Sequence, residues 1–176
     1  LFRSNVAHVN TINFQTDTGT SNSTRGVVGW NSTDNTLNLG LGDDSVLQIG
    51  QEELYFVYNQ SGQTIFNGNV CMFAGTSGAS GHIKAARANA AYPSQYVMGV
   101  ATQDIVNGNT GFVTHFGKVN GVDTSMFSAG DILYLDPTHV GGLTNTTPKA
   151  PNQKTIVAAV VNSHAVNGVL FVRPSI

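Results

Sequence analysis

Short β-forming runs separated by turn residues are the feature that most constrains the fold of this chain. Runs rich in Val, Ile, Leu, Tyr and Phe recur along the sequence, with Gly, Asn, Asp and Ser between them. This spacing is typical of an all-β sandwich or barrel rather than of strand–helix alternation. The strands we expect are Leu37–Leu41, Val46–Ile49, Leu54–Tyr58, Val70–Ala74, Tyr96–Thr102, Gly111–Val119, Ile132–Leu135, Thr155–Val161 and Val169–Arg173.

One segment offers a helical alternative. Lys84–Ala91 is rich in Ala and is followed by Pro93, which ends a helix. Apolar and polar residues also partly alternate there, as a strand requires, and we interpret the segment as an edge strand. Asp43-Asp44-Ser45 separates two expected strands and is predicted to be a turn.

Composition agrees with an all-β fold. Only 10% of the 176 residues are charged, against about 25% in a typical soluble domain, while 40% are hydrophobic and 20 are Gly. The apolar content excludes charge-driven disorder, and the shortage of charged helix formers excludes a long helical bundle. An uncharged surface rich in Thr, Asn and Gly fits strands joined by many turns.

Charge and cysteine content exclude further classes. The net charge is −2, and the eight basic residues are spread along the chain without the basic stripe that nucleic-acid binding requires. No apolar run approaches the roughly 18 residues of a membrane span, so we expect no membrane insertion. The single Cys71 lies in an apolar run and is expected to be a buried, inert thiol.

A shift in composition near residue 56 divides the chain. Residues 1–56 carry two basic and six acidic residues, a net charge of −4, and are rich in Thr, Asn and Ser. We expect an N-terminal arm with β-hairpins at 1–56, serving attachment or oligomerisation, and a compact antiparallel β-sandwich or barrel at 57–176. Residues 1–30 hold too few apolar residues to bury a core alone and are expected to pack against a partner.

A weak internal repeat runs through the second part. Gly68–Met72 is similar to Gly130–Tyr134, and Tyr96–Val100 is similar to Ile156–Val160. Pro93 then corresponds to Pro151, and Asn109–Val113 to Asn167–Phe171. Two explanations remain open, a true duplication and the common rhythm of Gly, strand and turn in any β-meander.

No motif for catalysis, cofactor binding or metal binding is found, and we predict none of these sites. The neighbouring acids Asp43-Asp44 and Glu52-Glu53 are expected at a solvated turn and strand end, because adjacent strand residues point to opposite faces. Gly75–Gly81 followed by Lys84 lacks the spacing of a phosphate loop and is interpreted as a flexible hairpin loop. Five histidines show no metal-ligand spacing: His8, His82, His115, His139 and His164.

Aromatic residues offer an alternative binding surface. A groove for sugar could be lined by such rings, but most lie inside apolar runs, and core packing is the prediction we prefer. The aromatic residues concerned are Trp30, Tyr55, Phe56, Tyr58, Tyr92 and Tyr96.

Several stretches of the chain resemble virion proteins of tailed bacteriophages. The resemblance covers roughly residues 29–176 and is most distinctive in the last segment. It is carried by Gly50–Gly68, Gly99–Ile105, Phe116–Val119, Val122–Ser125, Gly130–Leu135, Gly142–Asn152 and Leu170–Pro174.

This resemblance implies a β-rich, non-enzymatic part of the virion, assembled in the host cytoplasm and commonly trimeric. Tail-fibre, head-fibre and capsid-decoration proteins are the types concerned. Expected partners are further copies of the chain and other proteins of the capsid or tail. Of these types we favour a fibre or fibre-attachment protein; the alternatives are a capsid decoration or cement protein, and a receptor-binding module for a host surface glycan.

Overall fold

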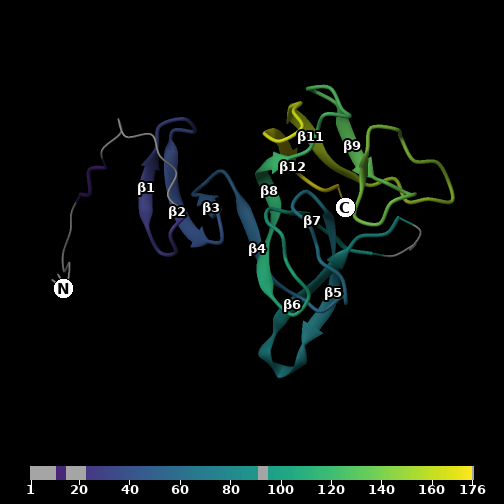
Figure 1. Ribbon diagram of the computed structural model, residues 1–176, viewed down its shortest axis with the longest axis horizontal. Helices are drawn as coiled ribbons and strands as arrows, with labels where there is room; N and C mark the ends of the chain where they lie inside the picture. Colours follow the sequence, from purple (N-terminus) through teal and green to yellow (C-terminus); the bar gives the residue numbers. More distant parts are fainter. Residues whose placement is uncertain (1–10, 15–22, 91–94, 176) are drawn as a thin grey trace.

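The computed structural model describes residues 11–14, 23–90 and 95–175, and within them the chain is all-β (Figure 1). The one helical element in this part is a short 3-10 turn at Gly78–Ser80. The strands are β1 (Val28–Asn31), β2 (Thr36–Gly42), β3 (Ser45–Gln48), β4 (Glu53–Asn59), β5 (Val70–Ser77), β6 (His82–Arg87), β7 (Val97–Ala101), β8 (Thr110–Val122), β9 (Ile132–Leu135), β10 (Leu143–Thr144), β11 (Ile156–Asn162) and β12 (Gly168–Val172).

The first three strands form a small antiparallel sheet that lies to one side of the other strands (Figure 1). Its β2–β3 hairpin turns at Asp43 and Asp44, whose φ angles of 49° and 58° are those of a two-residue turn with left-handed backbone. The predicted turn is therefore confirmed. Along β2 the polar Thr36 and Asn38 are buried, whereas Leu37 and Leu39 are half-buried.

Five strands close into a barrel. The first half of β8 pairs with β4 on one side and with β7 on the other, and β5 and β6 complete the ring. All of these pairings are antiparallel except β4–β6, which is parallel. The predicted barrel is confirmed, with this one parallel pairing added. The interior is filled by medium and small side chains: Val57, Ile65, Cys71, Ala85, Met98, Ala101, Ile105 and Val113.

A second sheet continues from the barrel through β8. The second half of β8 pairs with β12, followed in order by β11, β9 and β10. Its inner face packs against the outside of β5 and β7, so one core joins the sheet to the barrel. That core contains Val119, Leu133, Leu135, Val157, Val160, Leu170 and Val172 from the sheet, with Val70, Val97 and Val100 from the barrel.

The predicted repeat corresponds to two units with the same strand order. In the barrel the order is β4-β8-β7-β5-β6, and in the second unit it is β8-β12-β11-β9-β10. β8 therefore closes the first unit and opens the second. The first unit is a closed barrel, because its last strand β6 pairs with its first strand β4. The second unit is an open sheet, because β10 lies at its edge.

The same backbone hydrogen bonds recur in both units. In the first, Phe66 N donates to Asn69 Oδ1 (2.9 Å) and Asn69 N donates back to Phe66 O (2.9 Å). In the second, Ser128 N donates to Asp131 Oδ2 (3.0 Å) and Asp131 N to Ser128 O (3.0 Å). This shared turn precedes the first strand of each repeat, so the two units have the same local design as well as the same order.

The boundaries of the elements refine the expectations from sequence. The compositional shift at residue 56 falls inside β4, which pairs with β8 along most of its length. Lys84–Arg87 is a strand as preferred, within β6, but the prediction of an edge strand is wrong, because β6 pairs with both β4 and β5. Residues 88–90 lie beyond the strand, and Pro93 lies outside the described residues. β5 extends through Ser77, so Gly75–Gly81 is a hairpin connection shorter than expected.

The expected arm at 1–30 lies largely outside the described residues, and its last residues begin β1. Within the described part, no helix has the length and apolar character needed to cross a membrane.

Candidate functional site

The structure brings together few of the residues that sequence analysis examined for chemistry. Asp44 and Glu52 line one cleft, described below, and the rings of Tyr55 and His115 are in contact. Asp43 and Asp44 form the β2–β3 turn, and Glu53 is exposed on β4. Among the described residues, no three or more His, Cys, Asp or Glu side chains are placed to hold a metal ion. Cys71 is fully buried, and burial raises the pKa of its thiol to about 12. The thiol is therefore protonated at neutral pH and is a packing residue.

The described histidines make local contacts. His115 Nδ1 lies 2.8 Å from Met98 O and its ring contacts Tyr55. His164 Nδ1 accepts hydrogen bonds from the amides of Val166 and Asn167, and His139 Nδ1 lies 2.9 Å from Asp136 Oδ2. These three rings stabilise turns and strands. His82 begins β6, and His8 lies outside the described residues.

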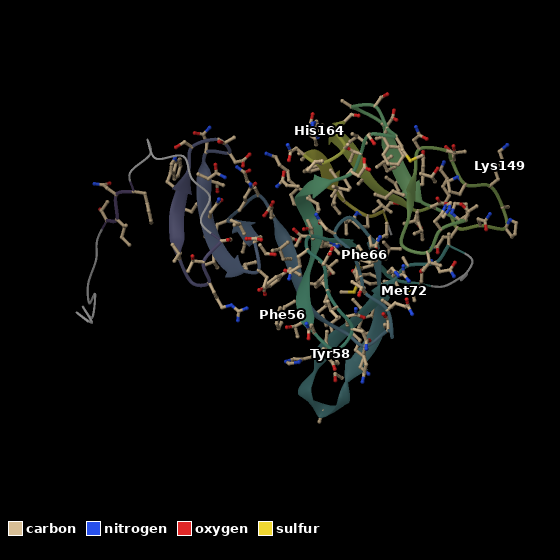
Figure 2. The ribbon with its side chains drawn as sticks, in the orientation of Figure 1. Phe56, Tyr58, Phe66, Met72, Lys149 and His164 are labelled. Atoms are coloured by element: carbon tan, nitrogen blue, oxygen red, sulfur yellow. The ribbon has the colours of Figure 1, made fainter. Side chains whose placement is uncertain are left out.

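Phe56, Tyr58 and Tyr96 lie outside the barrel core, contrary to the preferred prediction of core packing, whereas Tyr55 packs against that core as predicted. Phe56 is 50% exposed and Tyr58 is half-buried along β4 (Figure 2). Tyr55, also in β4, is half-buried as well. The physical reason is size, because a five-stranded barrel has a narrow interior that Val, Ala, Cys and Ile already fill. Trp30 in β1 is half-buried, Tyr96 is exposed, and Tyr92 lies outside the described residues.

Several of these rings pair on the surface. Phe56 packs against Phe112 with ring centroids 5.2 Å apart. This pair, with Leu39 and Leu41 of β2, lines an apolar groove of about 330 Å³ between the small sheet and the barrel. The hydroxyl groups of Tyr55 and Tyr96 lie 3.5 Å apart, and this contact raises the pKa of Tyr55 to about 12.

A second apolar surface, which we call the outer apolar row, crosses the C-terminal sheet on the face opposite its core. Phe171 of β12 is opposite Ala159 of β11, and Ala159 is opposite Ile132 of β9. Phe116 of β8 extends the row, since its ring meets Phe171 edge-on with centroids 5.4 Å apart. Ile132 is 46% and Phe171 38% exposed. The outer face of this sheet therefore carries an apolar stretch, next to the polar Lys118 and Asn120 of β8 that are opposite Phe171 and Val169. The solvent face of an antiparallel sheet is usually polar.

A cleft of about 320 Å³ lies between the small sheet and β8, and we call it the polar cleft. Amide, hydroxyl and carboxylate side chains dominate its walls. The lining residues are Asn31, Thr33, Asp34, Asn38, Asp44, Val46, Gln48, Glu52, Thr102, Lys118 and Asn120.

Asp34 organises the cleft from the turn between β1 and β2. Its Oδ1 contacts the ammonium group of Lys118 in β8, and its Oδ2 accepts hydrogen bonds from Asn31 Nδ2 (3.1 Å) and Gln48 Nε2 (2.8 Å). The hydrogen bond from Lys118 holds the pKa of Asp34 below its usual value. The carboxylate is thus fixed as an anion that joins the small sheet to the barrel.

Glu52 forms the floor of the cleft, just before β4. Its Oε2 accepts a hydrogen bond from the backbone amide of Gln48 (2.9 Å). Its side chain also covers Gly117, where an added Cβ would lie 2.5 Å from Glu52 Cγ. Burial raises the pKa of Glu52 to about 7. Hydrogen bonds from the backbone of Gln48 and Lys118 act in the opposite direction and lower this pKa, but burial has the larger effect. This carboxyl group therefore changes charge near neutral pH.

Gln48, at the end of β3, is one of three buried amide side chains of the cleft, with Asn31 and Asn38. The residue is only 7% exposed, and while its Nε2 donates to Asp34, its Oε1 accepts no hydrogen bond from the described residues. A buried amide oxygen without a donor is unfavourable, because it has lost its hydration without replacement.

Sequence analysis did not find the polar cleft. Glu52 was expected at a solvated strand end, and this prediction is wrong, because the carboxyl group is largely buried and its burial raises its pKa. Comparison of the chain with protein-family models, with curated proteins and with solved structures found no match.

Proposed function

We propose that this chain is a non-enzymatic, self-associating structural component of a bacteriophage virion, namely a fibre or fibre-attachment protein that docks on the capsid or tail. The proposal starts from the resemblance of residues 29–176 to tailed-phage virion proteins. It also places the protein in the virion, assembled in the host cytoplasm, with other virion proteins as partners and a homotrimer as its working form.

The outer apolar row is the structural observation that supports self-association. Ile132 and Phe171 stand exposed on a sheet face that has no covering layer in the described part of the chain. Contiguous apolar side chains on a surface are stabilised when a protein partner removes them from water. With so few charged residues on the chain, repulsion between identical copies is weak.

The hydrogen bonds of the polar cleft support a non-enzymatic role. Two of the three carboxyl groups that line the cleft, Asp34 and Glu52, accept hydrogen bonds that hold the small sheet in place. A protein that works by assembly needs such contacts between its parts. Capsid decoration remains an alternative, since it too is a non-enzymatic role that depends on assembly. Binding of the purified chain to capsids that lack it would favour decoration over fibre attachment.

The mass of the protein in solution tests the proposal. Light scattering coupled to size exclusion is expected to give three times the 18.5 kDa mass of the chain. Replacing Phe171 or Ile132 by Ser is expected to shift the protein toward monomer. Met126→Ser is the matched control, because Met126 is 89% exposed and lies away from the row. A wild-type chain that stays monomeric at every concentration would overturn the proposal.

A further inference from the structure

We propose that Lys118 and Asp34 react with each other to form an intramolecular isopeptide bond, which ties the small sheet to β8 covalently. The ion pair between these side chains is the state of the chain before the bond forms. The bond would join positions 84 residues apart in the sequence. This inference does not rest on the proposed self-association, because the reaction needs only one copy of the chain.

The two reacting groups are already in contact inside the polar cleft. Lys118 Nζ lies against Asp34 Oδ1, and a primary amine and a carboxyl group are the two components of an amide bond. The side chain of Asp34 is only 15% exposed, so the folded chain holds it in place. Two groups held in reactive contact behave as if one were present at an effective concentration of about 10⁵–10⁸ M, which favours the amide over hydrolysis.

Two side-chain amides are placed at the other oxygen of Asp34. Asn31 Nδ2 and Gln48 Nε2 donate to Oδ2 at 3.1 and 2.8 Å. The orientation of Asn31 is fixed, because its own Oδ1 accepts hydrogen bonds from the backbone amides of Thr33 (3.0 Å) and Asp34 (3.1 Å). When an amine adds to the carboxyl carbon, negative charge develops on Oδ2, and donors that are already in place stabilise that charge.

Glu52 is the group that can carry the proton the reaction has to move. An ammonium group is not a nucleophile and a carboxylate is a poor electrophile, so a proton must pass from Lys118 to Asp34. Glu52 lines the same cleft, and the charges of both partners act on its pKa, which burial raises to about 7. A carboxyl group with this pKa both gives and accepts protons at neutral pH, directly or through one water molecule.

The step balances without a further reactant. Protonated Glu52 gives its proton to Asp34 and takes one from Lys118, so it ends in the form in which it began. The lone pair of the neutral amine then forms a bond to Cγ of Asp34, and the C–Oδ1 bond breaks with loss of water. Ammonium and carboxylate have become one amide and one water molecule. The reaction occurs once in each chain and is not turnover, so it agrees with a non-enzymatic role.

Mass spectrometry of the full-length chain under denaturing conditions tests the bond. After the folded protein has been kept at pH 7, we expect a mass lower than that of the sequence by one water molecule. Trypsin is expected to leave the chain uncut after Lys118 and to release a branched peptide in which Gly26–Lys84 is joined to Ala88–Lys149. Fragmentation of that peptide is expected to place the link between Asp34 and Lys118.

Lys118→Arg keeps the positive charge but cannot form this amide, and it is expected to have the full mass of its sequence. Lys149→Arg is the matched control, because Lys149 is exposed and does not line the cleft, and it is expected to lose water as the wild type does.

Glu52→Gln cannot carry the proton and is expected to slow bond formation at least about a hundred-fold, followed as the linked fraction from the start of expression. Glu53→Gln, at the exposed neighbour, is expected to keep the wild-type rate. Unchanged backbone amide shifts in β11 and β12 show that each variant is folded.

Three results would overturn the inference. These are a wild-type chain of full mass that trypsin cuts after Lys118, loss of water that persists in Lys118→Arg, or a link that maps to another pair of residues. Equal rates in Glu52→Gln and the wild type would overturn the role of Glu52. A linked chain that is monomeric in light scattering would overturn only the proposed function, so the two failures are distinguishable.

Discussion

The ammonium group of Lys118 contacts the carboxylate of Asp34 across 84 positions of sequence and ties the small N-terminal sheet to β8. Asp34 is 15% exposed in its side chain and Lys118 36%, so the pair is partly shielded from solvent. Asn31 and Gln48 donate to the same carboxylate. The carboxylate of Asp34 therefore accepts hydrogen bonds from β1, β3 and β8, and it holds the small N-terminal sheet against β8.

Asp34→Asn removes that anion and is expected to loosen the small sheet. The three hydrogen bonds become weaker, and the expected loss is about 1–2 kcal/mol, reduced from the value of a fully buried pair because Lys118 is partly solvated. Hydrogen exchange of the β2 and β3 amides is expected to accelerate, while exchange in the barrel stays unchanged.

Asp43→Asn is the control for this change. Asp43 pairs with Arg25 at 3.9 Å in the same sheet, but both side chains are about three-quarters exposed, so little change in exchange is expected. Equal exchange rates in wild type and Asp34→Asn would show that the pair does not hold the sheet.

Glu52 gives the stability of the protein a pH dependence. Its pKa is about 7 in the folded chain against an ordinary value of 4.5, so between these pH values the unfolded chain releases a proton that the folded chain keeps. Raising the pH through this window therefore favours unfolding and lowers stability by at most about 3 kcal/mol. Above pH 7 the loss is complete. Asp34 is ionised in both states throughout the window, because its pKa lies below its usual value.

Urea unfolding from pH 4.5 to 8 measures this slope. Glu52→Gln carries no titrating group and is expected to flatten the slope and to be more stable than the wild type at pH 8. Glu53→Gln, at the exposed neighbour, is expected to keep the wild-type slope. The assignment to Glu52 fails if both variants retain the wild-type dependence.

The all-β fold followed from local patterns. Each predicted strand is present, because apolar runs bounded by turn residues specify a strand without reference to the rest of the chain. β1 and β10 were not predicted as separate strands. β10 has only two residues, and Val28–Asn31 lies in a segment where no alternation is evident. The repeat was also visible in the sequence, because Gly68–Met72 and Gly130–Tyr134 are similar and begin β5 and β9, which have the same place in the two units.

Relationships between distant segments could not be predicted. The run Leu54–Tyr58 indicates a strand, but only closure of a five-stranded barrel decides that Val57 points inward and Phe56 outward. In β2, Leu37 and Leu39 suggested the buried side, yet Asn38 is the buried residue, on the face that lines the polar cleft. No local signal joins Asp34 to Lys118, so the polar cleft was invisible in the sequence.

The thiol of Cys71 is expected to be unreactive in the folded protein. It is fully buried in the barrel and its pKa is about 12, so almost no thiolate is present at neutral pH. Labelling with a disulfide reagent at pH 8 is expected to be negligible without denaturant and complete in guanidinium chloride. Rapid labelling of the native protein would show that the barrel opens readily around β5 and β7.

Gly99 in β7 is the position where the barrel tolerates no side chain. A Cβ there would lie 1.9 Å from the carbonyl oxygen of Thr114, a backbone atom of β8 that cannot move without breaking the β7–β8 pairing. Gly99→Ala is therefore expected to destabilise the protein by more than about 3 kcal/mol, or to prevent folding. Gly29→Ala in β1 is the matched control, because nothing lies within 4 Å of its Cβ position, and it is expected to leave the denaturation midpoint nearly unchanged. Equal midpoints for the two variants would mean that β7 and β8 are not packed this closely.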